Sequence, residues 1–139
     1  MLDNSVAMRW CFERGAHPYA DAVLRHLAEP EARATVPVLW FYEAANVLVR
    51  AERQGILDAT AVGAFVGELR ALPIAVDPRF AQVFTAVRAL AVAHRLTVYD
   101  AAYLETAQRH RLPLATLDDE LIRASRSAGV AIFEAGGAS

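Results

Sequence analysis

Short apolar runs typical of β-strands alternate with segments typical of helices along almost the whole chain. Strands that alternate with helices form a mostly parallel sheet with helices on both faces, because parallel neighbours need a long crossover. The pattern therefore predicts an α/β fold whose sites lie at the carboxyl ends of the strands. The expected strands are Met1–Asp3, Ala34–Val36, Ile74–Val76, Leu112–Thr116 and Val130–Phe133.

Helices are predicted between these strands, and capping residues mark their ends. Asp58 and Thr97 each stand where a helix should begin, and Gly55 follows the end of another. Asp77 is expected to cap a helix whose first residue is Pro78. The expected helices span Ser5–Phe12, Pro18–Ala28, Leu39–Arg53, Asp58–Leu72, Pro78–His94, Thr97–His110 and Asp118–Ala128.

The chain length of 139 residues suits one compact domain. We expect this domain to span residues 1–134, with 135–139 as a flexible tail. No uncharged stretch approaches the ~20 residues of a transmembrane helix, so no membrane segment is expected. The one cysteine, Cys11, has no partner for an intrachain disulfide, which points to a reducing, cytoplasmic setting.

The basic residues exclude several classes of site. All fourteen are arginine, so the chain has neither the lysine of a P-loop nor a lysine for Schiff-base chemistry. The net charge of −2 argues against a protein that holds nucleic acid by bulk positive charge. It leaves open a nuclease with a local basic rim.

Four carboxylates stand among residues that favour burial: Asp3, Glu43, Asp100 and Asp118. A buried acid is costly unless it is paired or binds a metal. Asp3 and Asp118 follow predicted strands, so both should emerge at one edge of the sheet. Taken singly, each of these two suits a helix N-cap, and Asp100 suits a first-turn carboxylate. One shared acidic pocket explains all four together.

Such a pocket predicts a divalent cation, because clustered carboxylates repel one another and a cation removes the conflict. All-oxygen ligands suit Mg²⁺ or Mn²⁺, whereas the four histidines lack the spacing of a zinc site. A bound ion lowers the pKa of water and stabilises charge on a leaving oxygen. The pocket therefore suits hydrolysis of phosphodiester bonds.

Four segments resemble the signature blocks of PIN-domain ribonucleases, and most closely those of VapC-like toxins of type II toxin–antitoxin pairs. The resemblance covers essentially the whole chain, with the blocks in the same order. It implies a three-layer α/β/α fold with a mostly parallel central sheet, and Mg²⁺-dependent endoribonuclease activity. The segments are Asp3–Ala7, Glu43–Leu48, Thr97–Tyr103 and Thr116–Leu121.

The resemblance also implies roles for single residues. Asp3, Glu43, Asp100 and Asp118 become the catalytic and metal-binding acids, and Ser5, Asn46 and Thr116 become polar groups that support them. Toxins of this kind usually dimerise, and a small antitoxin bound across the site inhibits them. One departure concerns the first strand, since only Met1 and Leu2 precede Asp3. This strand is therefore expected to be short or to begin upstream.

Two further surfaces are candidates for binding. Arg9, Arg50 and Arg95 suit contacts with RNA phosphates, although scattered solvated arginines are as common. The aromatic residues 40–42 suit either the core or a groove for an antitoxin segment.

Three other functions stay open at this point. One is an RNA-processing nuclease of the same fold outside a toxin–antitoxin pair, and another is a non-catalytic partner-binding module. A phosphohydrolase of the aspartyl-phosphate type is disfavoured, because such enzymes usually need a lysine.

Overall fold

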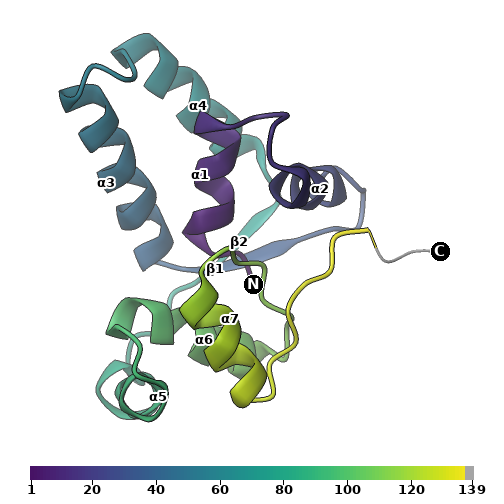
Figure 1. The fold of residues 1–139 in the computed structure, drawn as a ribbon, viewed down its shortest axis with the longest axis vertical. Coiled ribbons are helices and arrows are strands. Elements are labelled where there is room, and N and C mark those ends of the chain that lie inside the picture. The colour runs from purple at the N-terminus through teal and green to yellow at the C-terminus, as the bar shows by residue number, and fades with distance from the viewer. Residues whose placement is uncertain (137–139) are drawn as a thin grey trace.

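The computed structural model describes residues 1–136, and its elements follow the predicted alternation (Figure 1). The strands are β1 (Ala34–Pro37) and β2 (Ile74–Asp77). The helices are α1 (Asn4–Phe12), α2 (Pro18–Leu27), α3 (Leu39–Arg53), α4 (Ala59–Ala71), the π-helix η1 (Val83–Val87), α5 (Arg88–His94), α6 (Val98–His110) and α7 (Asp119–Ser127).

The strands run parallel. β1 pairs with β2 in the register Ala34↔Ile74 to Pro37↔Asp77. Leu2 lies beside β1, where its amide donates to the carbonyl of Thr35 at 3.1 Å. Single parallel bridges, Leu2↔Ala115 and Leu114↔Ile132, extend the pairing on the other side. Residues 3, 116 and 77 therefore all lie at the carboxyl edge of this sheet.

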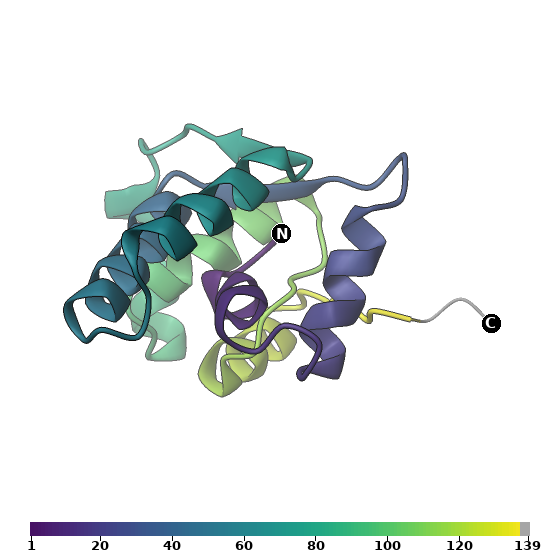
Figure 2. The ribbon, with the colours of Figure 1, turned by 90° about the horizontal axis from the view of Figure 1, so that it is seen from above.

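Helices cover both faces of the sheet, which confirms the three-layer α/β/α fold. On one side α1 packs against α2 and α3, while on the other α6 contacts β1, α5 and α7. Figure 1 shows the two strands between these groups. Figure 2 shows α3 and α4 side by side at one end of the molecule, with α2 at the opposite end.

Local hydrogen bonds explain where several helices begin. The Asp58 carboxylate accepts from the amide of Ala61 at 2.8 Å, and the Thr97 hydroxyl accepts from the amide of Asp100 at 3.1 Å. Both contacts satisfy amides that a first helical turn leaves without partners. The predicted helix Leu39–Arg53 is confirmed, and the other predicted starts shift by one residue at most, with the exception of the helix expected from Pro78.

The predicted helix Pro78–His94 is wrong in its first part. Residues 78–82 are not helical, and the chain continues as η1 and α5. Asp77 is the last residue of β2 and does not cap a helix. Its carboxylate accepts from the Arg79 amide and contacts Arg109 and His110 instead.

Three predicted strands are reduced to single bridges. Met1–Asp3, Leu112–Thr116 and Val130–Phe133 pair only at Leu2, Leu114, Ala115 and Ile132. Of the expected first strand, only Leu2 forms a bridge. Of the predicted tail, residues 137–139 lie outside the described residues.

One cluster of buried side chains joins the two helical layers to the sheet. Trp10, Trp40 and Tyr103 are its largest fully buried members. The indole of Trp10 donates to the carbonyl of Ala20 at 2.8 Å, which ties α1 to α2. Among residues 1–136, no helix is long and apolar enough to cross a membrane.

Candidate active site

Asp3 lies at the carboxyl edge of the sheet, where the chain leaves its bridge and enters α1. Only 5% of the residue is exposed. The hydroxyl groups of Ser5 and Thr116 both donate to its Oδ2 oxygen, at 2.6 and 2.7 Å. Asp3 occupies the N-cap position of α1, but its side chain makes no capping hydrogen bond to that helix. Two hydroxyl donors in one sheltered position are typical of a carboxylate held in a fixed orientation.

The Thr116 hydroxyl makes hydrogen bonds with both Asp3 and Asp118. Its hydroxyl oxygen also accepts from the amide of Asp118 at 3.1 Å. The Oδ1 oxygen of Asp118 accepts from the amide of Leu121 at 2.8 Å, so Asp118 does cap α7. A cap occupies one carboxylate oxygen, and the other oxygen is free to take part in the acidic pocket.

Asp100 lies in the first turn of α6, where Thr97 holds it. The Thr97 hydroxyl accepts from the Asp100 amide and donates to the Asp100 Oδ2 oxygen at 2.9 Å. The helix N-terminus also favours a negative charge at this position. The side chain is half-buried, so it is both oriented and accessible.

Glu43 reaches the same region from α3. The side chain is half-buried, and its Oε1 oxygen accepts from the hydroxyl of Tyr103 at 2.5 Å. Tyr103 lies on α6, three residues after Asp100 and therefore on the same face. A contact between residues sixty positions apart thus joins the two helices that carry Glu43 and Asp100.

Three of the four acids, Asp3, Glu43 and Asp100, have raised pKa values. Burial raises the pKa of Asp3, hydrogen bonds from Ser5 and Thr116 oppose this, and the charge of Asp118 raises it further. Burial also raises the pKa of Glu43, and repulsion from the charges of Asp3 and Asp100 raises it further. Burial raises the pKa of Asp100, whereas the hydrogen bond from Thr97 lowers it. The charges of Asp118, Asp3 and Glu120 also raise it. The site is a region of unneutralised negative charge.

The donor set fits a hard divalent cation. Every candidate ligand is a carboxylate oxygen, and mutual repulsion of this kind is relieved by positive charge. Among the described residues, no three Asp, Glu, His or Cys side chains form a ready cage. Mg²⁺ does not need one, because it keeps several waters and takes only one or two carboxylates directly. The residues present therefore suit a hard cation such as Mg²⁺ or Mn²⁺ better than Zn²⁺.

The other predicted site residues lie apart from the hydrogen bonds of the acids. Asn46 is exposed on α3, one turn after Glu43. The Arg9 side chain pairs with Glu13 at 2.5 Å. Arg50 is exposed in the last turn of α3, and Arg95 is exposed at the end of α5 with a φ of 55°.

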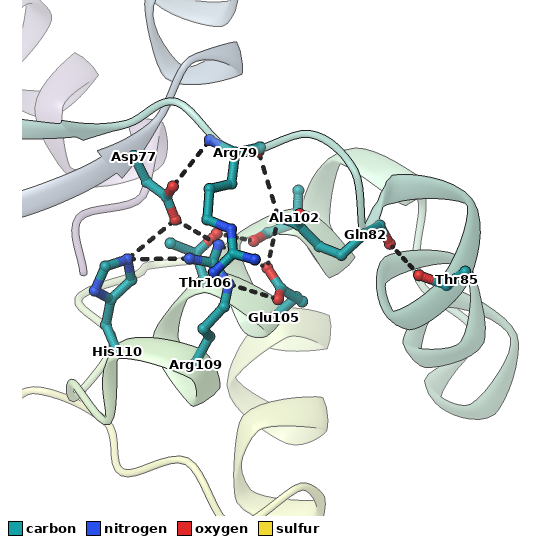
Figure 3. Close-up of polar contacts among 9 residues, drawn as sticks. All are labelled: Asp77, Arg79, Gln82, Thr85, Ala102, Glu105, Thr106, Arg109 and His110. Atoms are coloured by element: carbon teal, nitrogen blue, oxygen red, sulfur yellow. Dashed lines mark hydrogen bonds and ion pairs between the residues drawn. The ribbon is translucent and has the colours of Figure 1, made fainter.

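Sequence reasoning missed two features. One is the role of Tyr103, which the spacing Asp100-Ala-Ala-Tyr103 could have indicated. The other is a buried ionic network behind the site, shown in Figure 3. In this network Arg109 of α6 contacts both Glu105 and Asp77. The side-chain amide of Gln82 donates to the Glu105 carboxylate at 3.3 Å. The network anchors α6, the helix that carries Asp100.

Comparisons with known proteins agree with this architecture. A model of the family described as PIN domain matches residues 1–127. The crystal structure of PAE2754 from Pyrobaculum aerophilum is similar, with a TM-score of 0.66 and 26% sequence identity. That likeness covers 94% of this chain and 80% of the other. A comparison with curated proteins gives no match.

Proposed function

Because the chain belongs to the PIN domain family, whose members are generally nucleases, we propose that it is a metal-dependent endoribonuclease. It would hydrolyse RNA phosphodiester bonds with Mg²⁺ or Mn²⁺. The observation that carries this proposal is the electrostatic coupling of the buried Asp3 to the other acids. The charge of Asp3 raises the pKa of Glu43 and of Asp100, and the charge of Asp118 raises the pKa of Asp3. Three raised carboxylate pKa values in one place are a feature of functional sites.

The acids and the hydroxyl groups around them have different proposed roles. Asp3 and Asp100 are the proposed direct ligands, because hydroxyl groups fix one oxygen of each. Glu43 and Asp118 are the further carboxylates of the proposed metal site. When bound, the ion would lower the pKa of water and stabilise the leaving oxygen. Ser5 and Thr116 keep the Asp3 carboxylate turned toward the edge of the sheet.

Phosphates of the RNA need positive partners outside this negative pocket. Arg50 and Arg95 are exposed, and Arg9 is half-exposed in its pair with Glu13. We assign these arginines to phosphate contacts, which position a nucleic acid without selecting its sequence.

We further propose that the enzyme is the toxin of a toxin–antitoxin pair. In support, a hollow of about 210 Å³ lies between α3 and α4, close to Glu43. Trp40 lines this hollow, and its buried indole Nε1 has no hydrogen-bond partner among residues 1–136, while Phe41 is 44% exposed. An apolar antitoxin segment would use such a groove, where buried aromatic side chains act as anchors. The hollow is lined by Trp40, Phe41, Ala44, Ala45, Leu48, Val66, Leu69 and Arg70.

A homodimer is proposed from a second exposed surface. Phe80, Phe84 and Val92, around η1 and α5, are 79%, 85% and 72% exposed. Large apolar side chains exposed on neighbouring elements are a feature of interfaces, and η1 and α5 contact each other.

The alternatives are weaker. An RNA-processing nuclease outside a toxin–antitoxin pair would use the same acids but would not need the α3–α4 groove. A non-catalytic module has no use for four mutually repelling acids, which cost stability. An aspartyl-phosphate phosphohydrolase would need a lysine that the chain lacks.

The experiment is RNA cleavage by protein that has been stripped of metal. We expect cleavage with Mg²⁺ or Mn²⁺ and none with Ca²⁺ or EDTA, because Ca²⁺ is a poor activator of bound water. Asp3→Asn is the matched control for a contaminating nuclease, and it should be inactive under every condition. Robust cleavage in EDTA would overturn the metal-dependent mechanism.

A further inference from the structure

Tyr103 places a phenol hydroxyl against Glu43, one of the four acids. Its side chain is fully buried, and the hydroxyl donates to the Glu43 Oε1 oxygen at 2.5 Å. A buried hydroxyl without a partner is costly, so the pairing with a carboxylate explains how the ring can lie this deep. A phenol is protonated at neutral pH, so this hydroxyl acts as the donor and the Glu43 carboxylate as the acceptor.

The hydrogen bond limits where the Glu43 carboxylate can lie. A glutamate has three side-chain torsions, and this one is only half-buried, so its own packing does not fix it. Repulsion from Asp3 and Asp100 favours rotation of the carboxylate away from the other acids. A bond to a charged acceptor is about twice as strong as a neutral one and opposes that rotation.

The position of Tyr103 in α6 makes this restraint specific. Asp100 and Tyr103 are three residues apart, so one helix holds Asp100 directly and Glu43 through the phenol. The separation of the two acids is then set by one rigid element. No comparable restraint comes from Asn46, which is exposed one turn along α3.

From this geometry we infer that Tyr103 is a positioning residue, which holds Glu43 in the acid cluster through its hydroxyl and does not itself touch substrate. The inference rests on the proposed function, because it assigns to Glu43 a part in binding the cation. A purely structural role would require the aromatic ring alone. The two roles differ in what the hydroxyl does for metal binding.

The test compares four variants of the whole chain: Tyr103→Phe, Glu43→Ala, the double variant, and Tyr99→Phe. Tyr103→Phe keeps the ring and removes one oxygen. Tyr99→Phe is the matched control, because it removes the same oxygen from an exposed residue of the same helix. Mn²⁺ affinity is measured by electron paramagnetic resonance, RNA cleavage gives kcat and KM, and urea unfolding in EDTA reports folding.

We expect Tyr103→Phe to fold cooperatively and to lose roughly tenfold in Mn²⁺ affinity, since removing a group that orients a metal ligand typically costs 10–100-fold. The value of kcat should fall with KM nearly unchanged, and Tyr99→Phe should match the parent protein. In the Glu43→Ala background, removal of the phenol hydroxyl should have no further effect on Mn²⁺ binding.

Three results would overturn the inference. The first is parent-like Mn²⁺ affinity and kcat in Tyr103→Phe, which would leave the proposed nuclease function intact. The second is an undiminished loss in the Glu43→Ala background, which would show that Tyr103 acts through another group. The third is a parent protein that neither binds Mn²⁺ nor cleaves RNA, which would remove the proposed function together with this inference.

Discussion

The Arg109 guanidinium on α6 forms an ion pair with the Asp77 carboxylate at the end of β2 (Figure 3). The Asp77 side chain is 3% exposed, and that of Glu105, which contacts the same arginine at 2.9 Å, is 8% exposed. Two buried carboxylates thus depend on one guanidinium. The pairs join α6 to the strand beside it and hold the helix that presents both Asp100 and Tyr103.

Loss of this guanidinium should destabilise the protein strongly. We expect Arg109→Met to lower the free energy of unfolding by ~3 kcal/mol or more, because it leaves Glu105 buried without a cation and Asp77 with only His110 beside it. The measurement is urea unfolding near neutral pH. The matched control is Arg14→Met, which breaks the exposed ion pair with Glu68 and should cost no more than about 1 kcal/mol. Equal effects of the two substitutions would contradict a special role for the buried pair.

The metal-free protein should have a distinctive pH dependence. The pKa values of Asp3, Glu43 and Asp100 are raised above their ordinary values of 3.8 and 4.5, so the folded state takes up protons before the unfolded state does. Stability should therefore rise as the pH falls from about 6 toward 4. Thermal melts in EDTA across this range test the prediction, and saturating Mg²⁺ should flatten or reverse the slope.

Protonation of Asp77 at lower pH should reduce the stability of the protein, in contrast to protonation of the three acids of the candidate site. Burial alone would raise its pKa, but hydrogen bonds from Arg109, the Arg79 amide and His110 hold it below 3.8. Its stabilising contribution is lost as the pH falls through this lowered value. The Met1 amino group, whose pKa burial lowers to about 6, makes stability depend on pH only between about pH 6 and 8, where stability falls as the pH falls. A steady decline in stability from pH 6 downward would contradict the predicted rise.

The sequence could predict most of the architecture, because apolar periodicity and capping residues are local signals. Asp58 and Thr97 mark their helices without reference to the rest of the chain. The start of the helix after β2 could not be predicted in this way. Asp77-Pro78 has the local form of a cap, but Arg109 lies thirty-two residues away and contacts the carboxylate in the folded structure. Long-range pairing overrode the local preference.

The candidate site could likewise be predicted from the sequence only in part. Four acids in apolar surroundings were visible as a set, since burial of a charge is recognisable from its neighbours. In the structure, charges of Asp3, Asp100 and Asp118 raise the pKa values of other acids of this set. The restraint on Glu43 was not visible, because Tyr103 lies sixty residues away and its ring also suits a core position. The lengths of the outer strands also depend on pairing partners that are distant in sequence.

A charge placed on the exposed apolar surface around η1 and α5 should separate the proposed dimer. Phe84 is 85% exposed, so Phe84→Asp should leave the fold intact while disfavouring burial against a second copy. Sedimentation velocity at micromolar concentration should give a dimer for the parent and a monomer for the variant. Ile56→Asp, at an exposed residue after α3, is the control and should remain dimeric. A parent that is monomeric throughout would refute the proposed dimer.

The last prediction concerns Asp100→Asn, which keeps the shape of the side chain and removes one negative charge. The variant amide oxygen can still pair with the Thr97 hydroxyl, so α6 should begin at the same residue. RNA cleavage should fall by orders of magnitude if Asp100 binds the ion. Stability in EDTA should hold or rise, because repulsion from Asp118 and Asp3 is relieved.

Melting curves with and without Mg²⁺ separate this role from that of an ordinary first-turn carboxylate. A ligand that binds only the folded state stabilises it by RT ln(1 + [L]/Kd), so Mg²⁺ should raise the melting temperature of the parent more than that of Asp100→Asn. A first-turn carboxylate that serves only its helix contributes about 0.3–1 kcal/mol. In that case the variant would be slightly less stable, equally responsive to Mg²⁺ and fully active. That combination would show that Asp100 is not a metal ligand, since both the charge relief and the ion linkage would be absent.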